Sequence, residues 1–237
     1  MSKHHVYFDL LEGLRQPGCP VCRLAFRMTD SYLRSLLHEM VLDIGLRDQL
    51  REAQGFCQQH AWQLVAHRDG LGTAIIYRDV LNSVLKKMAT LGFDDVGPLT
   101  GMKAALRPHS PRPATRRAVE DLRPERSCLA CATYADMEEV YLSSLLEHLA
   151  TDNLKEAYSS SAGLCLPHLR RALQMVECEE AFRQLLDLQR PLWEALRAEL
   201  DEFTRKHDYR FTGEGFNSER DSWIRAVEAI IGCQKGA

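Results

Sequence analysis

The stretch Gly163-Leu164-Cys165-Leu166-Pro167-His168 decides how this chain is organised, because it is the second copy of a pattern. The first copy is Gly55-Phe56-Cys57-Gln58-Gln59-His60. Each copy is preceded in the chain by a Cys-x-x-Cys, namely Cys19-Pro20-Val21-Cys22 and Cys128-Leu129-Ala130-Cys131. Six of the eight cysteines and two of the nine histidines therefore belong to one duplicated pattern.

The spacing of the copies indicates an internal duplication. The two Cys-x-x-Cys pairs lie 109 residues apart, and the two Cys-x-x-His pairs lie 108 apart. The match extends past the cysteines, because Tyr32-Leu33-Arg34-Ser35-Leu36-Leu37 aligns with Tyr141-Leu142-Ser143-Ser144-Leu145-Leu146. Chance rarely places a shared Tyr-Leu-x-Ser-Leu-Leu between equally spaced pairs. We therefore predict two homologous repeats in tandem.

The composition is that of a globular protein without a basic surface for nucleic acid. The chain has 237 residues, of which 45% are hydrophobic and 27% charged, and its formal net charge is −3. This length can bury a core as one domain or two. The net charge argues against nucleic acid as a general partner.

The sequence predicts a cytoplasmic protein. Its N-terminus leads into no apolar segment of the kind a secretory signal needs, and no run of eighteen apolar residues could cross a membrane. Thiols stay reduced in the cytoplasm, where clustered cysteines bind metal more often than they form disulfides.

Apolar residues recur at three- and four-residue steps, which predicts an all-α fold. After Cys22 the pattern predicts a long helix with a core-facing stripe at Leu33, Leu36, Leu37, Met40, Val41 and Ile44. No convincing alternating strand pattern is present. Further helices are expected at 4–17, 46–54, 57–67, 73–91, 129–151, 167–178 with Pro167 in the first turn, 182–203 with a kink or break at Pro191, and 219–231 with Ser218 as its cap.

The segment 92–126 differs from the rest of the chain. It is rich in proline and arginine and poor in large apolar residues, so we expect a semi-extended linker. Its arginines could contact an acidic partner or nucleic acid, but a solvated linker is the simpler interpretation. The predicted organisation is a first metal-binding repeat at 1–91, this linker, and a second repeat with a C-terminal helix at 127–237.

Each repeat contains the ligands for one metal ion. Cys-x-x-Cys brings two sulfurs onto a tight turn, and Cys-x-x-His at a helix start presents sulfur and imidazole on one face. Together they make Cys₃His, a four-coordinate set that suits tetrahedral zinc and leaves no open position for a reactive water. The candidate metal ligands are Cys19, Cys22, Cys57, His60, Cys128, Cys131, Cys165 and His168.

The spacing does not decide which pairs share an ion. Ligation within each half is the simpler geometry. It groups Cys19/Cys22 with Cys57/His60 in the first half and Cys128/Cys131 with Cys165/His168 in the second. Sites shared between the halves remain open as the alternative.

The same ligands could hold an iron–sulfur cluster, in which histidine sometimes replaces cysteine. We favour two Zn²⁺ ions from ligand softness and the filled coordination shell. A thioredoxin-like role for Cys19-Pro20-Val21-Cys22 is disfavoured because no βαβ pattern surrounds it. Covalent haem is excluded, because Arg23 and Ala132 occupy the positions where the motif requires histidine.

Other residues give weaker signals. The duplicated Asp43 and Asp152 could orient a ligand histidine, or could simply end a helix. The sequence shows no nucleophile–base pair and no paired carboxylates, and thus gives no support for an enzyme. Tyr32 and Tyr141 are interpreted as core residues, and His38 and His148 as solvated residues on helix surfaces. Cys178 and Cys233 are interpreted as structural or free thiols.

At these motifs the chain resembles an uncharacterised prokaryotic family, a domain of unknown function with duplicated C-x₂-C and G-x-C-x₂-H motifs. The motifs lie here at 19–22, 55–60, 128–131 and 163–168, and the resemblance covers nearly the whole chain. Leu129 replaces the proline of the first copy, which should not affect ligation. The resemblance implies metal binding at the eight positions and implies no activity.

Two functions follow as hypotheses. The first is a zinc-containing helical protein that acts as an adaptor, assembly factor or regulator, with a protein partner in a helical groove between the halves. The alternative is an iron–sulfur protein in electron transfer, redox sensing or cofactor maturation. Metal content and colour would distinguish them.

Overall fold

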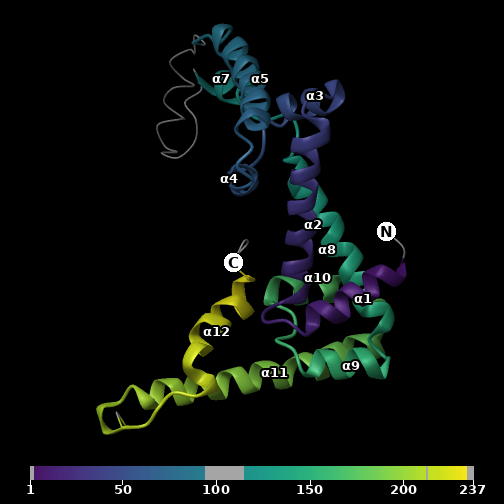
Figure 1. Cartoon of the computed structure of the whole chain (residues 1–237), viewed down its shortest axis with the longest axis vertical. Helices are drawn as coiled ribbons and strands as arrows, with labels where there is room; N and C mark the ends of the chain where they lie inside the picture. The colour runs from purple at the N-terminus through teal and green to yellow at the C-terminus, as the bar shows by residue number, and fades with distance from the viewer. Residues whose placement is uncertain (1–2, 94–114, 212, 234–237) are drawn as a thin grey trace, which may run out of the picture. The chain divides into compact units, whose positions relative to one another are not determined.

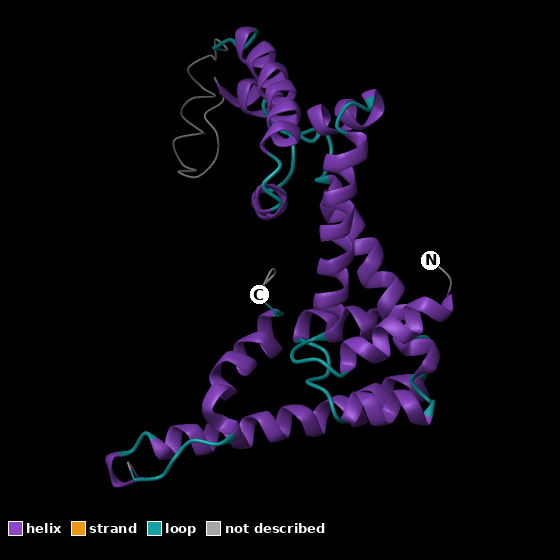
Figure 2. Ribbon diagram, viewed as in Figure 1, coloured by secondary structure: helices purple, strands orange, loops and turns teal. Residues whose placement is uncertain are grey.

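A computed structural model describes residues 3–93, 115–211 and 213–233, and these are helical with short connections. Figure 2 shows no strand in these ranges, which confirms the predicted all-α class. Of the expected linker 92–126, residues 94–114 lie outside the described residues, whereas Arg116–Asp121 forms helix α7. In the described ranges no helix is long and apolar enough to cross a membrane.

Contacts between residues divide the chain into two compact units. Unit 1 comprises Met1–Thr29 and Thr133–Ala237, and unit 2 comprises Asp30–Ala132. The division falls inside two helices, α2 (Pro20–Ser35) and α8 (Leu129–His148). Each unit therefore takes residues from both halves of the sequence.

Unit 1 is built from the N-terminal helix and most of the second sequence repeat (Figure 1). Its core contains Leu10, Leu14 and Leu24 together with Tyr141, Leu142 and Leu145 of α8, each with at most 1% of its surface exposed. Burial of each such leucine contributes about 1.5–3 kcal/mol relative to exposure. Besides the ends of α2 and α8, its α-helices are α1 (Lys3–Leu14), α9 (Asp152–Ser159), α10 (Leu166–Met175), α11 (Glu179–Lys206) and α12 (Ser222–Ile231).

Helix α11 differs from the expectation at Pro191. The helix continues from Glu179 to Lys206 without interruption, so the break considered at Pro191 is wrong. Proline removes one helical hydrogen bond, but Leu185 and Gln189 of the preceding turns are buried and hold this part of α11 against unit 1. Tertiary packing here outweighs the local cost of proline.

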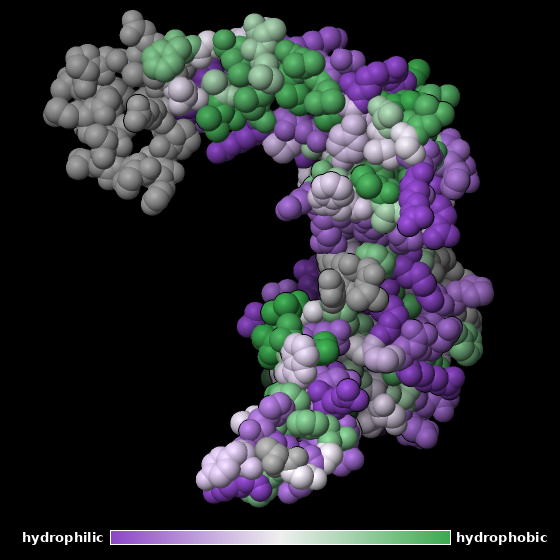
Figure 3. All heavy atoms as spheres, turned by 60° about the vertical axis from the view of Figure 1, so that its left-hand side comes forward, coloured by the Kyte–Doolittle hydropathy of each residue, from purple (hydrophilic) through white to green (hydrophobic). Residues whose placement is uncertain are grey.

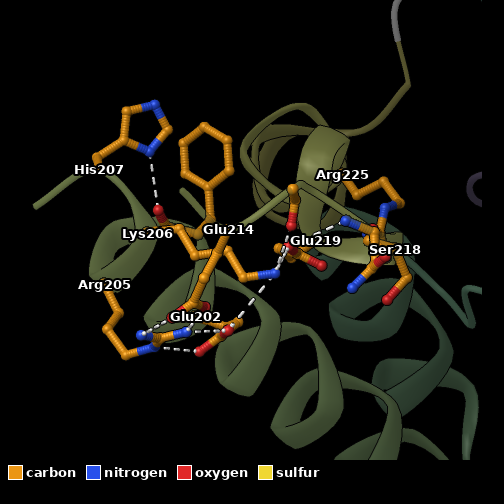
Figure 4. A network of polar contacts seen from close by, with 11 residues as sticks. Glu202, Arg205, Lys206, His207, Glu214, Ser218, Glu219 and Arg225 are labelled. Carbon is orange, nitrogen blue, oxygen red and sulfur yellow. Dashed lines mark hydrogen bonds and ion pairs between the residues drawn. The ribbon is translucent and has the colours of Figure 1, made fainter. Parts of the chain in front are cut away.

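A polar network joins α11 to the segment that precedes α12 (Figure 4). Lys206 Nζ donates to Glu219 Oε1 at 2.6 Å and to the Gly215 carbonyl at 2.9 Å, and both ion-pair side chains are buried. The hydrogen bond from Lys206 lowers the pKa of Glu219 to about 2. Beside this pair, Arg205 bridges Glu202 and Glu214.

The last helix begins later than expected. Ser218 opens a 3₁₀ turn, Ser218–Asp221, and α12 starts at Ser222, so Ser218 does not cap the helix. The predicted stop is confirmed, because α12 ends at Ile231 and Gly232 follows with φ of 95°. This left-handed conformation favours glycine.

Unit 2 packs its helices around a second core. The long helix expected after Cys22 is confirmed, because α2 continues into a π-helical turn, Leu36–Met40. Asp43 then caps α3 by accepting a 2.7 Å hydrogen bond from Leu46 N, which supports its helix-end interpretation. Besides parts of α2 and α8, the α-helices of unit 2 are α3 (Ile44–Glu52), α4 (Gln58–Ala66), α5 (Gly70–Ala89) and α7.

The buried residues of unit 2 come from α2, its π-helical turn and α3 to α5, including Leu33, Leu36, Leu50, Leu64 and Ile76. The opposite side of α5 is apolar but exposed, and green atoms mark exposed apolar side chains at the top of Figure 3. The exposed apolar residues of α5 are Leu71, Leu81, Leu85 and Met88.

Candidate metal centre

Four candidate ligands converge in unit 1, here called site A: Cys19, Cys22, Cys165 and His168. The imidazole nitrogen His168 Nδ1 lies 3.0 Å from Cys165 Sγ and 3.4 Å from the sulfurs of Cys19 and Cys22. The Cys22 and Cys165 sulfurs are 3.7 Å apart. All four residues are buried, so one ion could contact all of them away from bulk water.

The other four converge in unit 2, here called site B: Cys57, His60, Cys128 and Cys131. His60 Nδ1 lies 3.3 Å from the sulfurs of Cys57 and Cys131 and 3.6 Å from that of Cys128. The Cys57 and Cys131 sulfurs are 3.6 Å apart. His60 and Cys128 are buried, whereas Cys57 and Cys131 retain exposed surface.

The expected grouping within each half is wrong. Each site combines the Cys-x-x-Cys of one half with the Cys-x-x-His of the other. Helix α2 ends at Ser35, thirteen residues after Cys22, and so leads away from Cys22 over about 20 Å at the usual helical rise. Partners for Cys22 must therefore come from a segment packed at the start of α2, and in unit 1 that segment is the start of α10.

Local backbone structure places sulfur and imidazole together in each Cys-x-x-His. Cys165 is the N-cap of α10, with Pro167 in the first turn, and Cys57 is the N-cap of α4. The histidine three residues later lies on the same side of the helix start as the cysteine. Burial alone would raise the pKa of Cys57, but hydrogen bonds from the His60 backbone and from the thiols of site B lower it.

A glycine is required before each of these helix starts. Gly55 has φ of 87° and Gly163 has φ of 68°, both in the left-handed region. A Cβ on Gly163 would approach the Gln189 side chain to 2.7 Å, whereas one on Gly55 would approach Tyr77 to 3.1 Å. The loop before site A therefore has less space than the loop before site B.

A buried hydrogen-bond network supports the loop of site A. The Leu164 amide donates to Gln189 Oε1 at 2.8 Å, and the Tyr158 hydroxyl donates to the same oxygen. Burial raises the pKa of Tyr158, so its hydroxyl keeps the proton that it donates. Helices α9 and α11 thus fix the backbone that precedes Cys165.

Glu138 orients the histidine of site A. Its Oε1 lies 2.7 Å from His168 Nε2, on the side of the ring opposite the nitrogen that faces the sulfurs. A carboxylate on this nitrogen fixes the ring and makes the other nitrogen a stronger ligand. Neither aspartate suggested by the sequence occupies this place, because Asp43 caps α3 and Asp152 lies exposed at the start of α9.

The repeat contains no signal for Glu138. At the same 109-residue offset the first half has Thr29, whose hydroxyl donates to the Ala25 carbonyl within α2. Glu138 follows Cys131 by seven residues on α8, but Cys131 belongs to site B, so the spacing of the motifs does not associate Glu138 with His168.

The pKa values of the clustered ligand groups depend strongly on their neighbours. Hydrogen bonding, first from Cys165, lowers the pKa of Cys22 to about 6, whereas burial and the Cys57 thiol raise that of Cys131 to about 12. Burial alone would lower the pKa of His168, but hydrogen bonds with three cysteines and Glu138 raise it. The raised pKa values of Cys131 and His168 mean that these two groups hold protons that a bound metal must displace.

The two remaining cysteines differ in their surroundings. Cys178 is exposed at the start of α11. Cys233 instead lies beside site A, where its sulfur accepts a 3.2 Å hydrogen bond from the Cys19 amide. A hydrogen bond with Cys22 is the largest cause of the raised pKa of Cys233. No sequence motif associates Cys233 with these ligands.

The burial of the duplicated tyrosines and histidines agrees with the expectation except at His148. Tyr141 is fully buried, as expected, and Tyr32 packs against the core of unit 2. His38 is exposed, as expected, but His148 is partly buried and lies 4.4 Å from Tyr7 between ring centres.

Comparison with known proteins places the chain in one family. Residues 8–236 match the model of DUF6062, a family of unknown function. Searches of curated proteins and of solved structures found no match. The chain belongs to the DUF6062 family.

Proposed function

We propose that this DUF6062 protein binds one zinc ion in each Cys₃His site and acts as a helical protein-binding module. The observation that supports metal binding most directly is the spacing of the donor atoms. A tetrahedral zinc with usual bond lengths separates two sulfurs by roughly 3.8 Å and a sulfur from a nitrogen by roughly 3.6 Å. The sulfurs of Cys22 and Cys165 in site A are 3.7 Å apart, and those of Cys57 and Cys131 in site B are 3.6 Å apart. Both distances are close to that single-ion geometry.

The same spacing favours a single ion over an iron–sulfur cluster. A cluster has several atoms at its centre, and ligands on different irons lie farther apart than the corners of a one-ion tetrahedron. In both sites all four donor atoms lie within 4.8 Å of one another. Both sites therefore suit mononuclear zinc, and four protein ligands leave no position for a metal-bound water.

Each ion would join helix starts from the two sequence halves. In site A, the ligands at the start of α2 meet those at the start of α10. In site B, those at the start of α4 meet those at the start of α8. Metal binding would thus contribute directly to folding free energy, as in other small structural zinc sites. All eight cysteines are free, which supports a reducing, cytoplasmic location.

The exposed face of α12 supports a binding role. Trp223, Val227, Ile230 and Ile231 follow helical spacing and are 52–70% exposed. Contiguous exposed apolar residues commonly mark a protein-binding surface. We propose that α12 contacts a protein partner that presents an apolar surface.

Elemental analysis of protein purified without oxygen tests the metal proposal. We expect about two zinc ions per chain and a colourless solution, because each site provides one complete tetrahedral shell. A brown protein containing iron and acid-labile sulfide would contradict it, as would a chain that cannot be loaded with metal.

A photo-crosslinking amino acid at Val227 tests the binding proposal in cells. We expect one discrete protein adduct from this position and none from Glu194, an exposed control position on α11. Crosslinking that is absent, or equal at the two positions, would count against a partner on α12.

A further inference from the structure

The thiol of Cys233 lies against two of the proposed ligands of site A. Cys233 Sγ accepts a 3.2 Å hydrogen bond from the Cys19 amide, and the Cys233 and Cys22 side chains are hydrogen-bonded to each other. Cys233 is not among the four convergent residues of site A. Its sulfur is therefore a close neighbour of the proposed ligand set.

The end of α12 determines this position. Gly232 turns the chain with φ of 95°, and a Cβ there would lie 3.3 Å from Cys22 Sγ and 3.8 Å from Cys165 Sγ. The backbone of Gly232 thus passes directly over the two sulfurs. The next residue, Cys233, is placed beside Cys22 by this approach.

Site B has no equivalent thiol. Residues 30–132 contain three cysteines, and all three belong to site B. Cys178, the remaining cysteine of the chain, is exposed at the start of α11. The neighbouring thiol is therefore specific to site A.

We propose that Cys233 is an oxidation-sensitive thiol that forms a disulfide with Cys22 and so removes one metal ligand from site A. This inference rests on the proposed metal-binding function, because the released ligand matters only if site A holds an ion. Redox-sensitive cysteines commonly lie next to a second cysteine that completes the disulfide.

Hydrogen peroxide serves as the oxidant, and the reaction balances in two steps. The Cys22 thiolate attacks one peroxide oxygen, the O–O bond breaks, and Cys22 becomes a sulfenic acid as hydroxide leaves. Cys233 sulfur then attacks Cys22 sulfur, and its proton leaves with the sulfenic oxygen as water. Two electrons pass from the two sulfurs to the peroxide.

A cavity of about 190 Å³ borders site A and is lined in part by Gly18, Cys19 and Cys165. A small oxidant in this cavity would lie beside the ligand cluster that contains Cys22. After oxidation, Cys19, Cys165 and His168 would remain as ligands. A three-ligand zinc site no longer has the closed shell of a structural centre, so we expect site A to lose its ion.

The test treats the zinc-loaded full chain with hydrogen peroxide at neutral pH. Zinc release is followed with a coloured chelator, and disulfides are mapped on peptides without reduction. We expect a Cys22–Cys233 disulfide to form as site A loses zinc. Cys233→Ser should slow this loss by roughly tenfold, because the completing thiol is missing. Cys178→Ser, a matched control, should behave as wild type.

Two results would overturn the proposal: a disulfide that joins Cys22 to Cys19 or Cys165 instead, or equal zinc loss from site A in wild type and Cys233→Ser. Zinc content is measured before peroxide is added. A chain without zinc at that point refutes the proposed function, while peptide mapping still decides whether Cys22 and Cys233 pair.

Discussion

Glu138 illustrates how a single residue outside the motifs prepares a metal site. It contacts the nitrogen of His168 that faces away from the sulfurs, at 2.7 Å. The sequence could identify the eight residues that converge, because their types and spacing are repeated. It could not identify Glu138, because Thr29 occupies the corresponding position in the first half.

Replacing Glu138 with alanine should weaken zinc binding at site A by about 10–100-fold, because His168 loses the group that orients it. Site B should keep its affinity. Competition with a chelator of known affinity measures both sites. Glu139→Ala changes the next, exposed carboxylate and serves as the control. Equal affinities in Glu138→Ala and Glu139→Ala would contradict an orienting role.

The two motif glycines make a second prediction at this scale. Alanine in the left-handed region costs about 1–2 kcal/mol, and Gly163→Ala adds a 2.7 Å approach to Gln189. We expect Gly163→Ala to lower the free energy of unfolding more than Gly55→Ala does, as measured by denaturant titration of zinc-loaded protein. Gly213→Ala, where a Cβ meets nothing within 4 Å, is the control. Similar stability of Gly163→Ala and Gly213→Ala would refute this ranking.

At the scale of elements, hydrophobic periodicity predicted most helices but not every boundary. The long helix after Cys22, α2, was predicted from its apolar stripe. Helix α9 was not predicted, because its eight residues Asp152–Ser159 are a short, largely polar segment. Of the kink or break expected at Pro191, the break is wrong, since buried packing holds α11 together through the proline. Tertiary contacts decided the elements that local patterns did not.

The junction of α11 and α12 should stabilise the protein in a pH-dependent way. Lys206 lowers the pKa of Glu219 to about 2 from its ordinary value of 4.5. A lowered carboxyl pKa means that the stabilisation is full above pH 4.5 and declines as the pH falls toward 2.

The difference in Tm between wild type and Glu219→Gln should therefore be largest above pH 4.5 and shrink below it. Thermal unfolding across this range measures the difference. Glu180→Gln, on the exposed start of α11, should show no such trend. A Tm difference that stays constant down to pH 2 would show that the ion pair does not contribute as described.

At the scale of the whole molecule, neither half of the sequence provides all four ligands of one site. Four ligand pairs of equivalent chemistry can be combined in more than one way, so spacing alone could not choose between sites within halves and sites shared by them. The structure takes one pair from each half for both sites. Each proposed ion would therefore connect the first half of the chain to the second, and its removal should affect both.

Zinc content of two double variants tests this pairing most directly. Cys22→Ser with Cys165→Ser removes two ligands from site A alone, so we expect about one zinc ion per chain to remain. Cys22→Ser with Cys57→Ser removes one ligand from each site, so we expect close to none. The opposite result, with zinc retained by Cys22→Ser/Cys57→Ser and lost from Cys22→Ser/Cys165→Ser, would contradict the shared sites.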